Sequence, residues 1–434
     1  MKDLAKVVMS RIEMLGRITD EPGRLMRTFC SPAMRRANDL VARWMRQAGL
    51  AVREDPVGNL LGHYSTSRSK SKIKNQKSKI QKVFVLGSHL DTVRNAGKFD
   101  GMLGVVLAIA CVEQLKRKPT RLPFALEVVG FADEEGVRYQ SACLGSRAMA
   151  GTLGASDLKR KDAAGVSMAE AIRRFGGNPD KLNQARFDSR RLLGYLEAHI
   201  EQGPVLEQQR LALGIVTAIA GQSRFKIIFT GHAGHAGTTP MRSRRDALCA
   251  AAEFILAVEK EARGNAGLVA TVGQIQAEPN ASNVIPGAVE LTLDVRHQKD
   301  SMRKAARQRL RTLARRISAV RGVKGSVRLV QQTPAVPCSP GLSVFLKRSV
   351  LRHQRRVLAL PSGAGHDAAV MAKITPVAML FIRCKGGVSH HPAESVKIQD
   401  VRVALQVMSE FLALLARQAA GSSGAIGKTH AHGT

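Results

Sequence analysis

Several residue types are scarce in this chain of 434 residues, and each shortage excludes a class of protein. Aromatic residues make up 4% of the sequence, with Trp44 as the sole tryptophan, which argues against aromatic stacking platforms for nucleic acid. The six cysteines are scattered without a CxxC pair, so we expect a reduced cytoplasm rather than disulfides or a thiolate metal site. No uncharged apolar run is long enough to span a membrane. The start, MKDLAKVVMSRIEML, predicts a surface helix rather than a signal peptide.

Acidic residues are also scarce, because 34 Asp and Glu face 67 Lys and Arg, giving a formal net charge of +33. Such a field draws anions of any kind. Part of the excess lies in residues 66–82, TSRSKSKIKNQKSKIQK, which contain no acid. We interpret this segment as a low-complexity insertion between two strands. The usual fate of a charge run favours a solvated loop, and a polyanion-binding arm is the alternative.

The hydrophobic pattern predicts an α/β architecture. Hydrophobic residues make up 44% of the chain, as in a globular protein. A helix is expected over residues 33–49 and another over 101–115, and strand patterns precede and follow them. The strands are expected at residues 51–53, 59–63, 83–89 and 124–131. Strands that alternate with helices in this way indicate an α/β sheet.

The pattern of hydrophobic residues changes from about residue 219, where two alternating strand patterns lie beside two helical ones. We therefore predict an α+β domain over residues 219–334, inserted into a larger domain formed by 1–218 and 335–418. The Gly/Ser-rich segment 419–434 is expected to be a flexible tail.

Five segments place metal-type ligands after apolar strands or in glycine turns. They are GSHLDT (87–92), FDG (99–101), DEEG (133–136), EAHIEQGP (197–204) and VSHHPAE (388–394). Each alone has an ordinary explanation; Asp100, for example, could simply cap a helix. Together they supply His, Asp and Glu, the ligands expected for zinc or manganese. Bound cations would also explain three consecutive acids after a buried strand, and strand ends in α/β sheets are where such sites form.

The motifs GSHLDT, FDG, DEEG, HIEQGP, GHAGTTPM and SHHPAE, in this order, resemble the M20 family of dinuclear metallohydrolases. The resemblance is strongest to the branch of allantoate amidohydrolase, ureidoglycolate amidohydrolase and N-carbamoyl-L-amino-acid hydrolase. It extends from the first helix to about residue 415. It implies a metallopeptidase-like α/β catalytic domain, with a central mixed sheet flanked by helices, and an inserted α+β lid and dimerisation domain.

The resemblance also implies roles for the motif residues. One divalent ion would be held by His89, Asp100 and His199, and a second by Asp100, Glu135 and His390. The histidine directly after the serine, His390 rather than His391, matches the family pattern. Asp91 would orient His89, and Glu134 would be the general base. Asp133 and His366 receive no firm role.

Further residues match substrate-side positions of the family. The inserted domain would supply His235, which reaches a partner subunit's site and stabilises the oxyanion. An anionic substrate would face Asn283 and Arg296, since arginine forms a fork to a carboxylate. The remaining matches are Gln202 and Gln222, for the ureido group, and Gly387, where backbone could approach the substrate.

These features predict a hydrolase of carbon–nitrogen bonds other than peptide bonds, a cytoplasmic homodimer that uses two Zn²⁺ or Mn²⁺ ions. Gly221-Gln222-Ser223-Arg224 resembles allantoate-type members, and no large hydrophobic pocket is indicated near the motifs. We therefore expect allantoate as substrate, with release of ammonia and carbon dioxide. The alternatives are an N-carbamoyl-L-amino-acid, ureidoglycolate or β-ureidopropionate hydrolase, then an M20 aminopeptidase or deacylase, and last a non-enzymatic polyanion-binding protein. The partner expected is a small anionic ureido compound, with no membrane and no nucleic acid.

Overall fold

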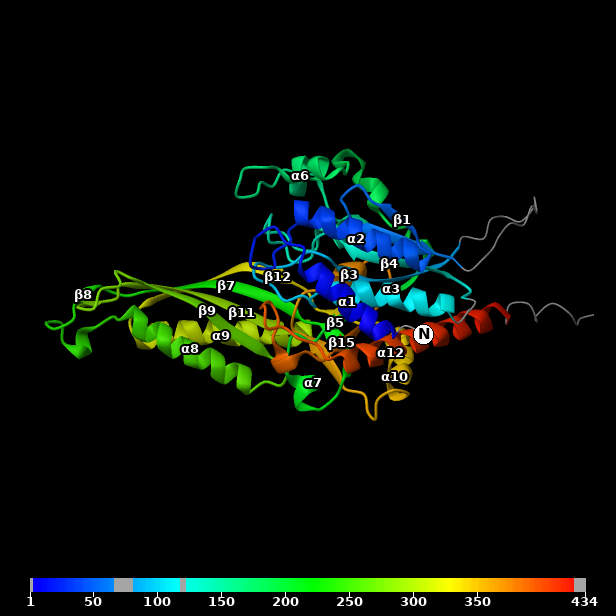
Figure 1. Cartoon of the computed structure of the whole chain (residues 1–434). Helices are drawn as coiled ribbons and strands as arrows, with labels where there is room; N and C mark the ends of the chain where they lie inside the picture. The colour runs from blue at the N-terminus through cyan, green and yellow to red at the C-terminus, as the bar shows by residue number, and fades with distance from the viewer. Residues whose placement is uncertain (1–2, 66–80, 118–121, 425–434) are drawn as a thin grey trace, which may run out of the picture. The chain divides into compact units, whose positions relative to one another are not determined.

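The computed structural model describes residues 3–65, 81–117 and 122–424 (Figure 1). Most of the predicted insertion, residues 66–80, and the last ten residues of the predicted tail lie outside the described residues. The chain forms two compact units. The first contains residues 1–217, 338–360 and 366–434, and the second contains Ala218–Pro337 and Pro361–Gly365.

The first unit is built from helices and strands in alternation. Its helices are α1 (Leu4–Gly16), α2 (Pro32–Ala48), α3 (Met102–Arg117), α4 (Leu144–Met149), α5 (Ala155–Leu158), α6 (Met168–Phe175), α7 (Val205–Gln208), α10 (Pro340–Leu351), α11 (Asp367–Met371) and α12 (Ile398–Gly424). Its strands are β1 (Ala51–Glu54), β2 (Leu60–Tyr64), β3 (Val83–His89), β4 (Ala125–Phe131), β5 (Leu192–Ile200) and β15 (Val377–Ile382). Two strands, β6 (Leu213–Ile219) and β14 (Ala359–Ser362), continue from this unit into the second.

Local sequence signals set these boundaries, as α2 shows. Ser31 caps its start by accepting a hydrogen bond from the Met34 amide at 3.1 Å, and Pro32 follows at the first helical position. Gly49 ends the helix in the left-handed conformation, with φ of 92°. The predicted helix at 33–49 therefore agrees with the observed one within a residue at each end.

The sheet of the first unit is mixed, as predicted. Its order is β1-β2-β4-β3-β5-β15-β6-β13, where β13 is Val336–Pro337, and β14 pairs with β6. The four central strands β4, β3, β5 and β15 are parallel to their neighbours in this series, whereas β2 and β6 run antiparallel beside them. Parallel central strands place their carboxyl ends at one edge, which is the edge where α/β proteins form sites.

Helices cover both faces of this sheet. On one face, β5 residues Leu196, Ala198 and Ile200 pack in one apolar core with α1, α2, α3, α10 and α12. On the other face, the alternate residue Glu197 accepts a hydrogen bond from the first turn of α11, at Ala368. Strands buried on both faces read as continuous apolar runs, which is why the sequence revealed them. The helix α12 continues past Ala419, where the sequence predicts a flexible tail.

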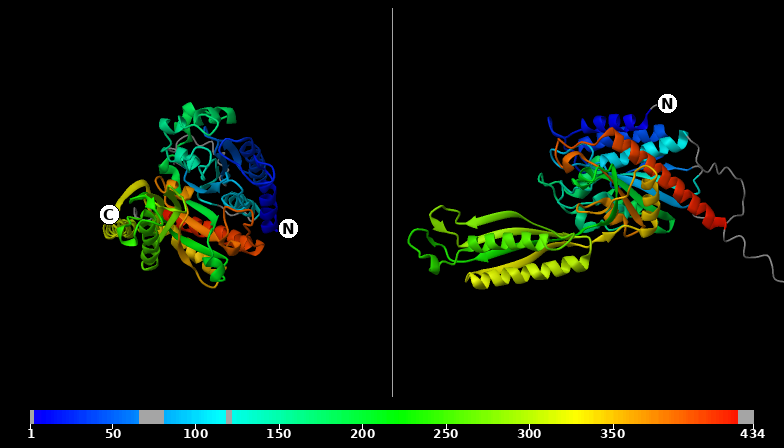
Figure 2. Two further views of the ribbon diagram at one scale, coloured as in Figure 1. Left: turned by 90° about the vertical axis from the view of Figure 1, so that its left-hand side faces the viewer. Right: turned by 90° about the horizontal axis from the view of Figure 1, so that it is seen from below.

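The second unit is a four-stranded antiparallel sheet with two helices on one face (Figures 1 and 2). The sheet order is β12-β7-β11-β9, and α8 and α9 pack on the alternate apolar residues of these strands. Its elements are β7 (Gly221–Thr230), β8 (Gly234–His235), α8 (Ala247–Arg263), β9 (Val269–Glu278), β10 (Val284–Ile285), β11 (Ala288–His297), α9 (Asp300–Val320) and β12 (Lys324–Thr333).

Residues 361–365 belong to the second unit, although the sequence predicted them in the larger domain. Hydrogen bonds explain the placement: the Ala220 amide donates to Ser362 O at 2.9 Å, and Arg296 Nη1 donates to Gly363 O at 2.6 Å. Among the described residues, no helix combines the length and the apolar character needed to cross a bilayer.

Candidate active site

The predicted ligands of the first unit follow the carboxyl ends of four adjacent parallel strands. His89 ends β3 and His199 is the penultimate residue of β5. Glu135 follows β4, and His390 follows β15. The bridging candidate, Asp100, lies two residues before the start of α3. The sheet order β4-β3-β5-β15 thus gathers segments that are far apart in the sequence.

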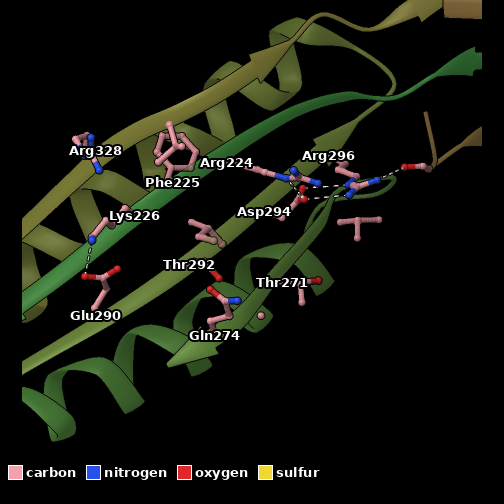
Figure 3. A pocket seen from close by; sticks show the side chains of 15 residues that line it. Arg224, Phe225, Lys226, Thr271, Gln274, Glu290, Thr292, Asp294, Arg296 and Arg328 are labelled. Carbon is pink, nitrogen blue, oxygen red and sulfur yellow. Dashed lines mark hydrogen bonds and ion pairs between the residues drawn. The ribbon is translucent and has the colours of Figure 1, made fainter. Parts of the chain in front are cut away.

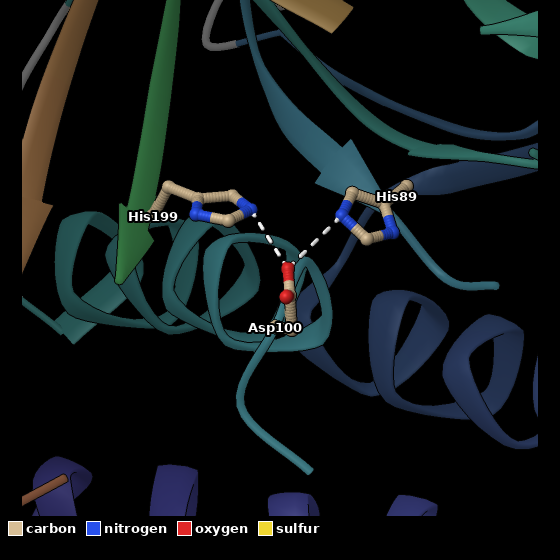
Figure 4. A group of neighbouring side chains, drawn as sticks. All are labelled: His89, Asp100 and His199. Carbon is tan, nitrogen blue, oxygen red and sulfur yellow. Dashed lines mark ion pairs between the residues drawn. The ribbon is translucent and has the colours of Figure 1, made fainter. Parts of the chain in front are cut away.

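The first predicted ligand group comes together at Asp100 (Figure 4). His89 Nε2 lies 3.4 Å and His199 Nε2 lies 3.1 Å from the same oxygen, Asp100 Oδ1. The three side chains are between 1% and 5% exposed. A carboxylate and two imidazoles in a dry pocket make a plausible ligand set for zinc or manganese.

The hydrogen bonds behind the two imidazoles test whether a cation fits. His199 Nδ1 lies 2.9 Å from Ile200 O, and His89 Nδ1 lies 3.1 Å from Asp91 O. A carbonyl oxygen can only accept, so each Nδ1 carries a proton and each Nε2 faces Asp100. Asp100 raises the pKa of both histidines against the effect of burial, which favours a positive charge on Nε2, the position that a bound cation would take. The donor set therefore fits a metal ion.

The second predicted group uses the other oxygen of Asp100. His390 Nε2 lies 3.3 Å from Asp100 Oδ2 and 3.3 Å from Glu135 Oε1. Asp100 is thus shared by both groups, which could hold two ions on one bridging carboxylate. The Gln202 side-chain amide donates a hydrogen bond to the same oxygen, Asp100 Oδ2, at 2.8 Å.

Close packing around Asp100 depends on a glycine. Gly101 has φ of 65°, and a Cβ at this position would lie 2.4 Å from atoms of the His89 ring. Only glycine combines this backbone conformation with the close approach. Glu394 secures the same turn, because its Oε1 accepts hydrogen bonds from the Phe99 and Asp100 amides at 2.7 and 3.1 Å.

Asp91 connects the first group to the acidic segment. Its Oδ1 lies 3.3 Å from His89 Nδ1 and accepts the Glu134 amide at 2.9 Å, while its Oδ2 accepts the Glu135 amide at 3.1 Å. One carboxylate therefore holds an imidazole and the backbone of both glutamates.

Burial or neighbouring charges raise the pKa values of three groups at this centre. Burial raises the pKa of Glu134 to about 8, with further increases from Glu135 and Asp91. Asp100 and then Glu135 raise the pKa of His390 to about 10. Burial lowers the pKa of His89, but Asp100 and Asp91 outweigh it and raise the pKa well above its usual value. Glu134 can thus hold a proton at neutral pH.

Three buried residues that received no role in the sequence lie close behind this centre. His366 packs its ring edge-on against His199, with ring centroids 4.6 Å apart. Glu197 could join these two histidines as a ligand group, and it accepts a hydrogen bond from Ser88 Oγ at 2.9 Å. Burial raises the pKa of Asp367 well above its usual value. Glu197 begins the segment EAHIEQGP, whereas His366 and Asp367 lie outside the five ligand segments, and nothing in the sequence indicates that these side chains are buried here.

Asp133 is buried as well, and its Oδ2 has no hydrogen-bond partner among the described residues. Burial and the charges of Asp91 and Glu134 raise its pKa well above the usual value. The three acids of DEEG therefore occupy different environments: only Glu134 and Glu135 join candidate ligand groups.

The second unit brings two of the predicted substrate residues together. Val284 pairs with His235 in the β8–β10 ladder, and the Ala236 amide donates to Asn283 O at 2.9 Å. His235 Nδ1 accepts the amides of Gly237 and Thr238 at 3.1 and 3.2 Å. Because Nδ1 is the acceptor, Nε2 carries the proton and makes the exposed ring a donor.

Gln222 and Arg296 lie opposite each other on β7 and β11. A cavity of about 890 Å³ adjoins Arg296 (Figure 3). Arg296 lines this cavity with Arg224, Lys226 and Arg328. The cavity lies on the face of the β-sheet opposite α8 and α9, which this unit leaves uncovered, and charged side chains make up much of its lining.

Gly387 is required by packing in the first unit. Its φ is 68°, and a Cβ would lie 2.5 Å from the Gly203 carbonyl carbon. The close backbone approach at this glycine is therefore to Gly203 and Pro204.

Comparisons with known proteins agree with this architecture. A probable allantoate deiminase from Oryza sativa subsp. japonica is 39% identical, over 96% of this chain and 89% of its own length. An N-carbamoyl-L-amino acid amidohydrolase from Geobacillus stearothermophilus is 40% identical, over 92% of this chain and 95% of its own. These relatives are named as enzymes that act on carbon–nitrogen bonds.

Solved structures are similar over the same extent. A hydantoinase/carbamoylase family amidase from Burkholderia ambifaria has a TM-score of 0.86 and 33% identity, covering 95% of this chain and 97% of that one. AtUAH in complex with (S)-hydroxyglycine has a TM-score of 0.75 and 33% identity, with the same coverage. Residues 85–414 match the peptidase family M20/M25/M40. The predicted family is thus confirmed, and the chain belongs to peptidase family M20/M25/M40.

Proposed function

We propose that this protein is a metal-dependent amidohydrolase that cleaves the ureido C–N bond of allantoate and releases ammonia and carbon dioxide. The observation that supports this most is the shared carboxylate of Asp100, which lies between two ligand groups beside the buried Glu134. The relatives named as allantoate deiminases support the substrate.

Two divalent ions, zinc or manganese, would be held by the two groups that meet at Asp100. When bound, such ions polarise a carbonyl and lower the pKa of water. The protein holds the ligands in place through Asp91, Ile200 O and Glu394, which fix His89, His199 and the Asp100 turn.

Glu134 is the proposed general base. It takes a proton from the attacking water and delivers it to the nitrogen that leaves the ureido carbon. A pKa near the working pH serves both steps, and burial raises the pKa of Glu134 to about 8.

His235, Asn283 and Arg296 are the proposed substrate residues of the second unit. The protonated Nε2 of His235 suits an oxyanion donor, in the partner subunit's site of a homodimer. Arg296 suits the substrate carboxylate, and Gln202 and Gln222 suit the ureido group. The complex of AtUAH with (S)-hydroxyglycine, a small carboxylic acid, supports an anionic ligand. A cytoplasmic location and the dimer stay predictions, and sedimentation velocity tests the dimer.

A second candidate is the hydrolysis of N-carbamoyl-L-amino acids. The Geobacillus stearothermophilus relative is as similar as the rice one, at 40% against 39% identity. The cavity of about 890 Å³ beside Arg296 also offers room for amino-acid side chains.

Ammonia release from allantoate tests the proposal directly. We expect turnover of allantoate with zinc or manganese to exceed that of ureidoglycolate and of N-carbamoyl-L-amino acids, compared by kcat/KM. Faster release of free amino acid from N-carbamoyl substrates would favour the second candidate. Turnover of dipeptides alone would contradict both.

A further inference from the structure

One carboxylate in the second unit organises three of the polar side chains around it. Asp294 lies on β11 directly opposite Arg224 of β7, two residues from Arg296. Its Oδ2 accepts from Gln222 Nε2 at 2.6 Å, from Arg224 Nε at 3.2 Å and from Arg296 Nη2 at 3.0 Å. Its Oδ1 accepts from Arg296 Nε at 3.0 Å. Figure 3 shows the two guanidinium groups converging on this carboxylate.

Among the described residues, these contacts leave one donor hydrogen on each terminal nitrogen of Arg296 without a partner. Asp294 takes Nε and one Nη2 hydrogen, and Gly363 O takes one Nη1 hydrogen at 2.6 Å. A guanidinium has five N–H donors, so one hydrogen remains on each terminal nitrogen. Two parallel donors are what a carboxylate binds in a fork. Asp294 therefore holds the arginine by one edge while the donors for a ligand stay available.

The same contacts set the local charge. Arg224 and Arg296 contribute two positive charges at this end of the cavity, and Asp294 cancels one. Further along the sheet, Lys226 and Glu290 form a separate pair at 2.6 Å. The Asp294 cluster thus carries one net positive charge, which matches a ligand with one carboxylate better than a ligand with two.

We propose that Asp294 is a positioning and specificity-determining residue: it holds Arg296 for the substrate carboxylate and restricts this site to monoanions. The inference rests on the proposed function, in which Arg296 binds that carboxylate. Asp294 is half-buried and keeps its charge at neutral pH, because Arg296 and Arg224 outweigh burial and lower its pKa.

Inhibition by two acids of nearly equal shape tests the charge rule. Succinamate carries one carboxylate and succinate carries two. We expect succinamate to inhibit the wild-type protein with a lower inhibition constant than succinate, when each competes with allantoate. In Asp294→Asn, the ratio of the two inhibition constants should shift about tenfold towards succinate, because the cluster gains a charge. The KM for allantoate should rise more than kcat falls, since the arginine loses its support, and Asp294→Glu should restore part of the wild-type KM.

Glu290→Gln is the matched control. It removes a carboxylate from the same cavity but leaves the two arginines paired with Asp294. An equal shift in both variants would overturn the inference, because general charge would then explain the effect. An unchanged ratio in Asp294→Asn would also overturn it. Calorimetric titration with the two acids measures the same ratio without turnover, so that a failure of the proposed allantoate activity is distinguishable from a failure of this inference.

Discussion

Asp100 is the residue on which the candidate centre depends. Its two oxygens face three imidazoles, with His89 and His199 on Oδ1 and His390 on Oδ2. The proton positions on His89 and His199 leave acceptors opposed to acceptors, an arrangement that is stable only with cations between them or with protonated rings. The shared carboxylate therefore couples both ligand groups to one turn of the backbone.

Exchanging the acid of Glu134 separates proton transfer from metal binding. Glu134→Gln keeps the size of the side chain but cannot accept a proton. We expect kcat to fall by roughly a hundredfold to ten-thousandfold, with metal content unchanged by mass spectrometry. Asp100→Ala should lose both turnover and metal, because both ligand groups share that carboxylate. Near wild-type turnover in Glu134→Gln would show that another group is the base.

Metal uptake should release protons from His390. Without metal, Asp100 and Glu135 raise the pKa of His390 to about 10, so its ring is protonated at pH 7.5 and must lose that proton to become a ligand. We therefore expect the apparent metal affinity to fall as the pH falls below about 10, with about one proton released from this ring. Calorimetry in buffers of different ionisation enthalpy counts the protons.

The adjacent histidine provides the comparison. His390→Asn should release about one proton fewer on metal binding, whereas His391→Asn should match wild type, because Nδ1 of His391 accepts the Ala393 amide at 3.1 Å outside the ligand groups. If His391→Asn instead releases fewer protons than wild type, His391 rather than His390 is the ligand.

At the scale of elements, the turn before α3 has little tolerance for change. Gly101→Ala places a methyl against the His89 ring in a left-handed backbone conformation. The backbone strain alone costs about 1–2 kcal/mol, and displacement of the ring should weaken metal binding about tenfold by distorting its ligand geometry. Thermal unfolding and metal content measure the two effects.

Gly23→Ala separates strain from displacement. Gly23 also has a positive φ, of 79°, but a Cβ there meets no atom within 4 Å. The Gly23→Ala variant should therefore lose about as much stability as Gly101→Ala but retain its full metal content. Equal metal loss in both variants would mean that the Gly101 effect is a general one.

The fold followed from sequence because its strands are buried on both faces and read as apolar runs, as VFVLGSH does at β3. The ligand segments could be found because they follow such strands or lie in a glycine turn, as Asp100 does before α3, and the M20 resemblance joined them into two groups. The arrangement around Asp294 could not be predicted. It depends on the register that sets Asp294 opposite Arg224, and on a loop 67 residues further along that brings Gly363 O to Arg296. Neither contact leaves a local signal in the sequence.

At the scale of the whole molecule, the chain carries a net charge of +33, although its candidate centre contains several carboxylates. A positive field raises the local concentration of anionic substrates and speeds their encounter. The same field draws nucleic acid and other polyanions without specificity. At physiological salt, exposed charges act on ions in solution mainly within a Debye length, about 8 Å.

Removing residues 66–80 tests how much of that field the lysine-rich insertion supplies. The deletion can be closed by a short linker, because Gln81 Nε2 donates to Ser65 Oγ at 3.0 Å across the gap. We expect elution from heparin at clearly lower salt, since six cations are removed. The kcat/KM for allantoate should stay within about twofold, because salt screens the effect of these six charges beyond about a Debye length. A variant that keeps the length but replaces the six cations with Ser and Gln should behave as the deletion does. Wild-type elution of the charge-replaced variant would show that these charges do not supply the heparin affinity. Loss of most turnover in either variant would contradict the expectation that the segment contributes little to kcat/KM.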